Sequence, residues 1–317
     1  CYISTMNERL SILSNILGSH YQTNDECVFF CPYCKHEKRK FSVNLKRNVY
    51  KCWVCNQRGR SLYRVVRRFG SFKDQEGWRA LTGAPREDLS RFEALFEAEK
   101  PGEIVQVVDL PKDFKSLTHK KLNSTARKTV KYLKNRGIDK KDILQWKIGH
   151  CSEGRYRDRI IFPSFNENGD ANYFVARSLT DGDFKYLNPA ASRNIIFNEL
   201  YLDFGKEVTI VEGIFDAMKA GNAVPILGST LSENSLLFKK IIKHDTPILL
   251  ALDKDAKWKA LKIKRLLLKY GIEVRELDLE EYEDVGEMSK DEFKRLSSTA
   301  SFVQEEDILV SLLSDVS

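Results

Sequence analysis

The chain has 317 residues, of which 42% are hydrophobic and 31% are charged, and its formal net charge is +7. This length is sufficient for two or three domains that each bury a core. The mean hydropathy is −0.41, and the sequence shows neither an apolar run long enough to cross a bilayer nor a signal-peptide pattern at its start. These observations argue against a membrane protein, and we expect a soluble protein of the cytoplasm.

The charges are distributed unevenly along the chain. Residues 1–70 contain 13 Lys/Arg and 4 Asp/Glu, whereas residues 205–317 contain 16 Lys/Arg and 21 Asp/Glu. The basic N-terminal region can attract a polyanion, and the acidic C-terminal region can hold divalent cations. The seven cysteines are an odd number without a secretory signal, which argues against a disulfide framework.

The first predicted module spans residues 1–70. Apolar residues at helical spacing predict helices over residues 7–19 and 61–70, and alternation over residues 41–45 predicts a strand. Two Cys-x-x-Cys pairs lie within the module, formed by Cys31 and Cys34 and by Cys52 and Cys55. Because four thiolates can close a tetrahedron around zinc, we predict one structural zinc ion rather than a redox pair or buried thiols.

Many basic and aromatic residues surround these cysteines. They are Lys35, His36, Lys38, Arg39, Lys40, Lys46, Arg47, Lys51 and Arg58, with Tyr33, Tyr50 and Trp53 between them. Cations bind phosphates and exposed rings can stack on bases, so nucleic acid is the expected partner of this surface. The alternative is that the aromatic residues pack the small core.

A charged stretch separates this module from a second unit. Residues 71–104 are predicted to form a linker with one or two helical turns. Residues 126–146 predict two short helices around Gly137. Residues 157–178 predict two strands joined by a turn at Asn168-Gly169.

From Val208 onward, strand-like runs alternate with helical stretches, which is typical of a parallel sheet with crossover helices. Acidic residues follow successive strands of this sheet, namely Glu212, then Asp253 and Asp255, then Asp284. Ligands of such sheets bind at the carboxyl ends of the strands. Carboxylates gathered there repel one another unless a hard cation such as Mg²⁺ neutralises them. Each of these acidic residues alone could equally be a helix cap. The prediction of a metal site depends on the fact that all of them follow successive strands.

Together these motifs resemble the DnaG-type replicative primases of bacteria and phages. The cysteine pairs are similar to the primase zinc-binding domain, in the all-cysteine version common in phage enzymes. Glu212-Gly213 with Asp216, Asp253-x-Asp255 and "EDVGEMS" are similar to a TOPRIM domain, and the preceding unit is similar to the basic subdomain of the primase polymerase core.

The resemblance implies a multi-domain α+β and α/β protein. The expected parts are a zinc-ribbon template-binding domain (1–70), a linker (71–104), a basic N-terminal subdomain of the RNA polymerase core (105–205), a TOPRIM catalytic subdomain with a Rossmann-like parallel sheet (206–290) and a C-terminal helical tail (291–317).

The resemblance also implies roles for individual residues. Glu212, Asp253 and Asp255 would hold two or more catalytic Mg²⁺ or Mn²⁺ ions, with Asp284 as a helper. The residues that would face nucleotide phosphates or the template–primer are Arg159, Arg177, Lys185 and Asn188.

Two features depart from the family pattern. Asn198 stands where many relatives have a lysine, so either another cation, such as Lys206, takes that role or the affinity for nucleotides is tuned differently. Little of the chain follows residue 300, where bacterial relatives carry a helicase-docking domain. The apolar face within residues 305–316 is expected to pack on its own domain or to fray rather than to dock on a helicase.

The implied function is that of a DNA primase, which joins ribonucleoside triphosphates into short RNA primers on single-stranded DNA by two-metal nucleotidyl transfer. A replicative helicase is an expected further partner, and the compact size and four-cysteine ribbon suggest a phage origin. Two alternatives stay open. One is another TOPRIM enzyme, a nuclease or topoisomerase, although none of the 12 tyrosines has the context of a topoisomerase nucleophile. The other is a non-enzymatic zinc-ribbon DNA-binding protein, which would leave the acidic strand ends unexplained.

Overall fold

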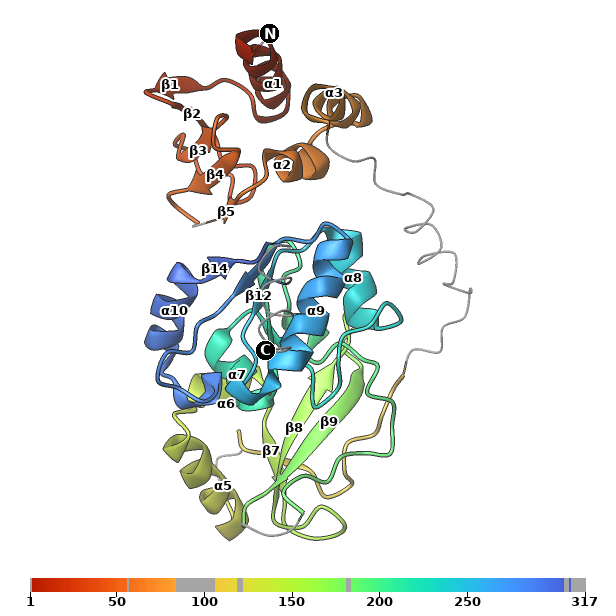
Figure 1. Cartoon of the computed structure of the whole chain (residues 1–317). Helices are drawn as coiled ribbons and strands as arrows, with labels where there is room; N and C mark the ends of the chain where they lie inside the picture. Colours follow the sequence, from red (N-terminus) through yellow and green to blue (C-terminus); the bar gives the residue numbers. More distant parts are fainter. Residues whose placement is uncertain are drawn as a thin grey trace, which may run out of the picture. The chain divides into compact units, whose positions relative to one another are not determined.

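The computed structural model describes residues 2–55, 57–83, 106–118, 122–180, 184–304 and 308. The chain divides into two compact units, Cys1–Ala98 and Glu99–Ser317, which are described separately (Figure 1). Within the described ranges, no helix combines the length and the apolar character that a membrane span requires.

The N-terminal unit contains a five-stranded antiparallel sheet with strand order β1-β2-β3-β4-β5. Its strands are β1 (Tyr21–Thr23), β2 (Glu26–Phe29), β3 (Phe41–Asn44), β4 (Val49–Cys52) and β5 (Arg58–Gly59). Its helices are α1 (Tyr2–Leu17), α2 (Leu62–Phe69) and α3 (Phe72–Thr82). The two helices and the strand expected within residues 7–70 are therefore confirmed.

Helix α3 corrects the expected position of the linker. We expected a linker from residue 71, but Ser71 and Asp74 form a capping box that starts an 11-residue helix. Trp78 of this helix is buried in the core of the N-terminal unit, and the Arg9 guanidinium lies 4.7 Å from its ring centroid. The helix therefore belongs to the N-terminal unit, and residues 84–105 lie outside the described residues.

The second unit begins with an antiparallel sheet of strand order β6-β7-β8-β9. Its strands are β6 (Lys115–Ser116), β7 (Gly149–Cys151), β8 (Arg159–Phe165) and β9 (Ala171–Ser178), and its helices are α5 (Ser124–Asn135) and α6 (Lys140–Gln145). The turn between β8 and β9 contains Gly169 at φ +89°, and the connection between the helices contains Gly137 at φ +69°. Glycine adopts these left-handed conformations without strain, which explains the predicted hairpin and helix pair.

A second sheet follows with order β11-β10-β12-β13-β14, in which only the pairing of β13 with β14 is antiparallel. Its strands are β10 (Val208–Val211), β11 (Ala223–Pro225), β12 (Ile248–Leu250), β13 (Val274–Glu276) and β14 (Ser301–Phe302). The helices are α7 (Ile214–Ala220), α8 (Leu236–His244), α9 (Lys257–Lys269) and α10 (Lys290–Thr299), with short 3₁₀ turns η1 (Glu199–Tyr201), η2 (Lys254–Ala256) and η3 (Val285–Glu287). The predicted parallel sheet with crossover helices, and with it the mixed α+β and α/β class, is confirmed.

The end of the described chain is part of this sheet rather than a separate tail. We expected a helical tail from residue 291, but α10 leads into β14, which pairs with β13 at the edge of the sheet (Figure 1). Ile308 is buried, and the rest of the predicted apolar face beyond residue 304 lies outside the described residues.

Candidate active site and metal centre

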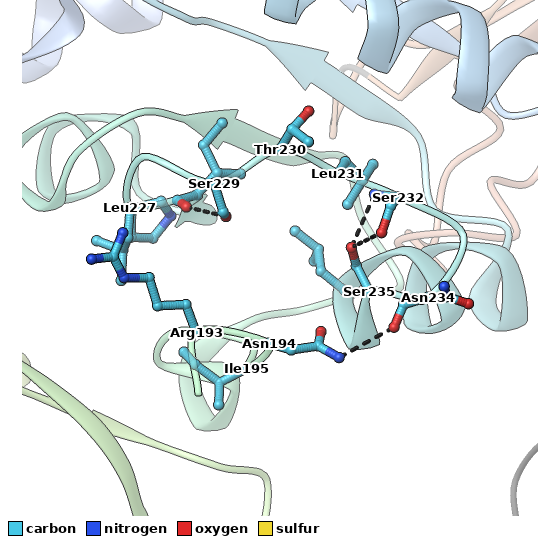
Figure 2. A pocket seen from close by; sticks show the side chains of 13 residues that line it. Arg193, Asn194, Ile195, Leu227, Ser229, Thr230, Leu231, Ser232, Asn234 and Ser235 are labelled. Atoms are coloured by element: carbon cyan, nitrogen blue, oxygen red, sulfur yellow. Dashed lines mark hydrogen bonds between the residues drawn. The ribbon is translucent and has the colours of Figure 1, made fainter. Parts of the chain in front are cut away.

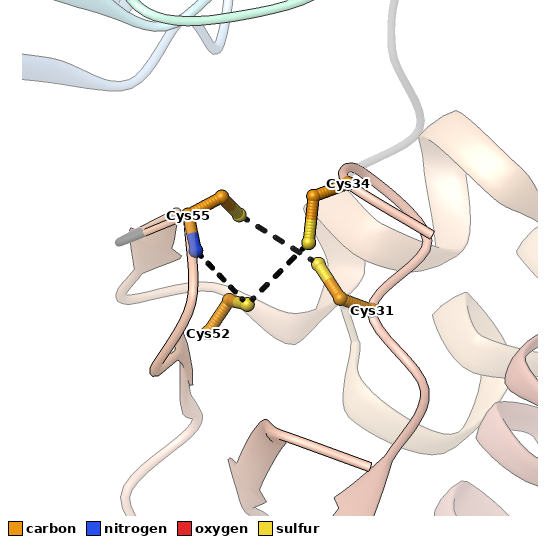
Figure 3. A group of neighbouring side chains, drawn as sticks. All are labelled: Cys31, Cys34, Cys52 and Cys55. Atoms are coloured by element: carbon orange, nitrogen blue, oxygen red, sulfur yellow. Dashed lines mark hydrogen bonds between the residues drawn. The ribbon is translucent and has the colours of Figure 1, made fainter. Parts of the chain in front are cut away.

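Four cysteine side chains of the N-terminal unit converge on one point (Figure 3). The Sγ atoms of Cys31 and Cys55 are 3.8 Å apart, those of Cys34 and Cys52 are 3.9 Å apart, and all four lie within 4.8 Å of one another. Sulfurs held about 2.3 Å from a tetrahedral zinc are about 3.8 Å apart. A disulfide would bring two of them to about 2.05 Å. The cluster therefore fits the predicted structural zinc ion.

Zinc binding at this cluster is coupled to the core of the unit. Cys31 and Cys52 are buried members of the same hydrophobic cluster as Phe41 and Val65. Burial raises the pKa of Cys31 and raises that of Cys55 to about 11. Zinc binds thiolates, so its binding displaces protons from these groups and adds folding free energy to that of the hydrophobic core.

Only one of the three aromatic residues named from the sequence around this cluster is strongly exposed. Tyr50 is buried, and Tyr33 packs edge-on against Phe69. Trp53 is 60% exposed, and the Nζ of Lys51 lies 4.0 Å from its ring centroid. The combination of an exposed indole and a cation is what a stacked base and its phosphate would contact.

A cavity of about 490 Å³ in the second unit brings together side chains of opposite charge. Its acidic lining residues are Glu212, Asp216, Asp253 and Asp284, and its cationic and amide lining residues are Arg136, Arg177, Lys185, Arg193 and Asn188. The acidic residues lie at the ends of strands of the parallel sheet and in the connections that follow them. Ligands of such sheets bind at the carboxyl ends of the strands, so this is the expected position of a ligand site.

The turn between β10 and α7 positions two of the carboxylates. β10 is buried throughout and ends at Val211, so Glu212 is the first residue beyond the strand. The backbone N–H of Gly213 donates to Asp216 Oδ2 at 2.7 Å, which caps α7 and fixes the Asp216 side chain. Burial raises the pKa of Asp216 to about 6, and the carboxylates of Asp284 and Glu212 also raise it.

The other two carboxylates come from the segments after β12 and β13. Asp284 accepts a hydrogen bond at Oδ1 from the backbone N–H of Glu287, 3.0 Å away. A Cβ at Gly286 would lie 2.8 Å from Asp216 Oδ1 and 3.1 Å from Asp284 Oδ1, so any side chain there would force the Asp216 carboxylate to shift. Burial and the neighbouring carboxylates raise the pKa of Asp253 to about 7. The four groups therefore repel one another while they are charged.

Two oxygen atoms of these carboxylates fit a hard cation. Within the described part of the chain, Glu212 Oε1 and Asp253 Oδ1 are buried and have no hydrogen-bond partner. A buried oxygen anion without a donor is costly unless a cation compensates it, and carboxylate oxygens are the ligands that Mg²⁺ and Mn²⁺ prefer. The carboxylates are not gathered as closely as the four sulfurs, because among the described residues only the four cysteines form a cluster tight enough to hold a metal ion without other ligands. Waters and substrate oxygens would complete the coordination shell.

Arg177 is the most constrained cation of the cavity. It is buried, its Nε donates to Tyr132 Oη, and its Nη1 donates to Tyr186 Oη, both at 2.6 Å. Its guanidinium lies 5.5 Å from the ring centroid of Phe215, and that of Arg136 lies 5.2 Å from the same centroid. These contacts hold positive charge beside the carboxylates in a fixed orientation, as the binding of a phosphate group requires.

No protein-family model matches the chain. Curated relatives do match it over most of its length. A DNA primase of Buchnera aphidicola is 25% identical over 342 residues, covering 89% of this chain and 56% of the relative, and one of Aquifex aeolicus is 26% identical over 345 residues, covering 90% and 64%. Among solved structures, the zinc-binding and RNA polymerase domains of the Aquifex aeolicus primase are 19% identical with a TM-score of 0.49, covering 95% of this chain and 85% of that one.

The chain resembles the DnaG-type DNA primases. It spans about half the length of the first curated relatives that it matches, since the matches cover 56%, 54% and 55% of those proteins. The comparison agrees with the resemblance inferred from the cysteine pairs and the acidic strand ends.

The cavity contains most of the residues that the resemblance to primases selects, but not all of them. Glu212, Asp253 and Asp284 line it together with Arg177, Lys185 and Asn188. Asp255 and Arg159 do not line it. Asp255 is exposed, although its charge contributes to the raised pKa of Asp253, and Arg159 donates to the backbone oxygen of Phe184 at 2.9 Å.

Asn198, which departs from the primase pattern, and Lys206, the cation suggested in its place, also lie outside the cavity. Asn198 is buried, and its backbone N–H donates to Ser164 Oγ at 2.9 Å while its Oδ1 accepts from the backbone N–H of Phe165. Lys206 forms an exposed ion pair with Asp203 at 2.7 Å and does not line the cavity.

Three charged lining residues were not selected from the sequence as site residues, namely Arg136, Arg193 and Asp216. Arg193 also borders a neighbouring cavity of about 310 Å³, in which Asn194 Nδ2 donates to the Asn234 backbone oxygen at 3.2 Å (Figure 2). Leu227 lines both cavities as well, so the two are adjacent. Only Asp216 carried a sequence signal, because it lies within the TOPRIM-like motif.

Proposed function

We propose that this protein is a DNA primase that joins ribonucleoside triphosphates into short RNA primers on a single-stranded DNA template. The observation that carries the proposal is the cavity in which four carboxylates of one sheet and the cationic residues of its surroundings meet. The similarity to curated DNA primases over most of the chain supports the same reaction.

The carboxylates of Glu212, Asp216, Asp253 and Asp284 would hold Mg²⁺ or Mn²⁺, which when bound lowers the pKa of a ribose 3′-hydroxyl and neutralises charge on phosphoryl oxygens. Arg177 would bind triphosphate oxygens, and its orientation is already set by Tyr132 and Tyr186. Because the guanidinium is already held in place before the substrate binds, ordering this side chain does not reduce the binding free energy. Residues predicted from the primase pattern but outside the cavity, Asp255 and Arg159, would act from its margin.

The N-terminal unit would bind the template. Its four cysteines fit a structural zinc, and its surface combines exposed Trp53 with Lys51. Proteins bind single-stranded DNA by stacking aromatic side chains on its bases and by pairing cationic side chains with its phosphates. Ribonucleotides and a replicative helicase as partners, and action in the cytoplasm, are part of the same proposal.

The proposal is tested by incubating the zinc-loaded protein with single-stranded templates of varied sequence, Mg²⁺ and labelled ribonucleoside triphosphates. We expect short RNA products, and we expect Asp253→Ala to lower dinucleotide synthesis by more than about 100-fold while DNA binding is retained. Asp109→Ala removes an exposed carboxylate outside the cavity and serves as the matched control.

Two outcomes would contradict the proposal. Full activity of Asp253→Ala would remove the carboxylate assignment. Magnesium-dependent cleavage of labelled DNA without ribonucleotide incorporation would instead favour a TOPRIM nuclease.

A further inference from the structure

A lysine pairs with one oxygen of Glu212, a carboxylate that the proposed metal site would use. Lys259 Nζ lies 2.8 Å from Glu212 Oε2, and the two side chains are only 27% and 18% exposed. The other oxygen of the same carboxylate, Oε1, is buried and has no hydrogen-bond partner in the described part of the chain. Lys259 therefore compensates the charge of the Glu212 carboxylate at Oε2, whereas no described residue donates a hydrogen bond to Oε1.

The position of Lys259 distinguishes it from other lysines of α9. The lysines of this helix are Lys257, Lys259, Lys262, Lys264 and Lys269. Lys264 pairs with Glu276 at 2.9 Å and Lys269 pairs with Glu233 at 2.8 Å, and neither of those acids lines the charged cavity. Lys259 pairs with Glu212, the acid that follows strand β10, and reaches it from the helix that follows Asp253.

The electrostatics of the cavity explain why such a contact forms. The carboxylates of Glu212, Asp216, Asp253 and Asp284 repel one another when no cation lies between them. A lysine within hydrogen-bond distance of one of them offsets part of that repulsion, and its compact ammonium can leave when another cation arrives. A divalent ion and the ammonium cannot both use Glu212 Oε2 at full strength, because each is repelled by the other.

We propose that Lys259 is a positioning residue, an internal counter-ion of Glu212 that a divalent cation displaces when it binds and that thereby sets the affinity of the site for that cation. The proposal rests on the metal site of the proposed function. A lysine that only anchors α9 to β10 would make the same contact but would not influence metal affinity, and this difference makes the proposal testable.

The test measures Mn²⁺ binding to the zinc-loaded full chain by electron paramagnetic resonance of the free ion, without substrate. Lys259→Gln removes the competing charge, and we expect its Mn²⁺ dissociation constant to fall about fivefold, the factor that a partly exposed ion pair can supply. Lys264→Gln removes the same charge from the same helix outside the cavity, and its constant should match that of the wild type. Lys259→Arg keeps the charge and should bind Mn²⁺ no more tightly than the wild type.

A second measurement needs no variant. Acetylation of wild-type lysines, quantified by mass spectrometry, should become faster at Lys259 as Mn²⁺ is added, with Lys264 as the internal reference. Unchanged acetylation of Lys259, or equal or weaker Mn²⁺ binding by Lys259→Gln, would overturn the inference while leaving the metal site intact. Absence of Mn²⁺ binding in every variant would overturn the metal site and the inference together.

Discussion

Replacing Asp253 by asparagine should stabilise the metal-free protein while it abolishes function. Burial and the neighbouring carboxylates raise the pKa of Asp253 from 3.8 to about 7. One pKa unit corresponds to about 1.4 kcal/mol. The rise of about 3 pKa units therefore means that ionised Asp253 destabilises the folded state by at most about 4 kcal/mol. Since the side chain is only half-buried, solvent screening reduces this to about 2 kcal/mol.

The sign of the pH dependence follows from the direction of the shift. The folded state holds the Asp253 proton more tightly than the unfolded state, so the wild type loses stability as pH rises from 3.8 to about 7. Asparagine carries no proton and escapes this loss. The advantage of Asp253→Asn over the wild type should therefore grow with pH, by about 1 kcal/mol between pH 5 and pH 8.

The measurement is native-state hydrogen exchange of the β10 and β12 amides in metal-depleted buffer. These strands lie in the second unit, so the result does not depend on unfolding of the N-terminal unit. Comparing variant with wild type at each pH cancels the intrinsic pH dependence of exchange, and Asp109→Asn is the control. A free-energy difference that stays constant from pH 5 to pH 8, or that falls, would refute the reasoning.

Three further predictions test other parts of the structure. Removal of zinc by a chelator, or Cys31→Ser, should unfold the N-terminal unit while the β10 and β12 amides stay protected from exchange, because structural zinc supplies about 10 kcal/mol or more of folding free energy. Gly286→Ala should weaken Mn²⁺ binding about tenfold or more, measured by electron paramagnetic resonance, because its Cβ would lie 2.8 Å from Asp216 Oδ1 and push that carboxylate away. Trp53→Ala should weaken binding of a single-stranded DNA oligonucleotide about tenfold in fluorescence anisotropy, and should leave thermal stability nearly unchanged because the ring is 60% exposed.

Local patterns in the sequence predicted the elements that depend on local chemistry. The two strand-like runs within residues 157–178 and the Asn168-Gly169 turn predicted the hairpin of β8 and β9, since a glycine at positive φ closes such a turn. The spacing of the two cysteine pairs gave the metal cluster, because four thiolates leave few other arrangements.

The boundaries and the less regular parts of the site depended on tertiary contacts. Asp255 was expected beside Asp253 because residues two apart on a strand share a face. However, β12 ends at Leu250 and Lys254–Ala256 is a 3₁₀ turn, so the spacing of two no longer means a shared direction. Arg193 lies in irregular structure with no periodicity to mark it, and the lysine that meets Glu212 is one of five on α9. Only the rotation of that helix in the folded protein decides which lysine contacts Glu212.

The parallel sheet ends in very short strands on both sides. β11 has three residues and finishes with Pro225, which has no N–H to offer, and β14 has two residues. An unpaired strand of normal length would be a template on which a second chain could add its own strand. These edge strands are so short that they offer an incoming strand very few backbone N–H and C=O groups to pair with, and Pro225 removes one N–H from β11. The sheet is therefore protected against edge-to-edge aggregation.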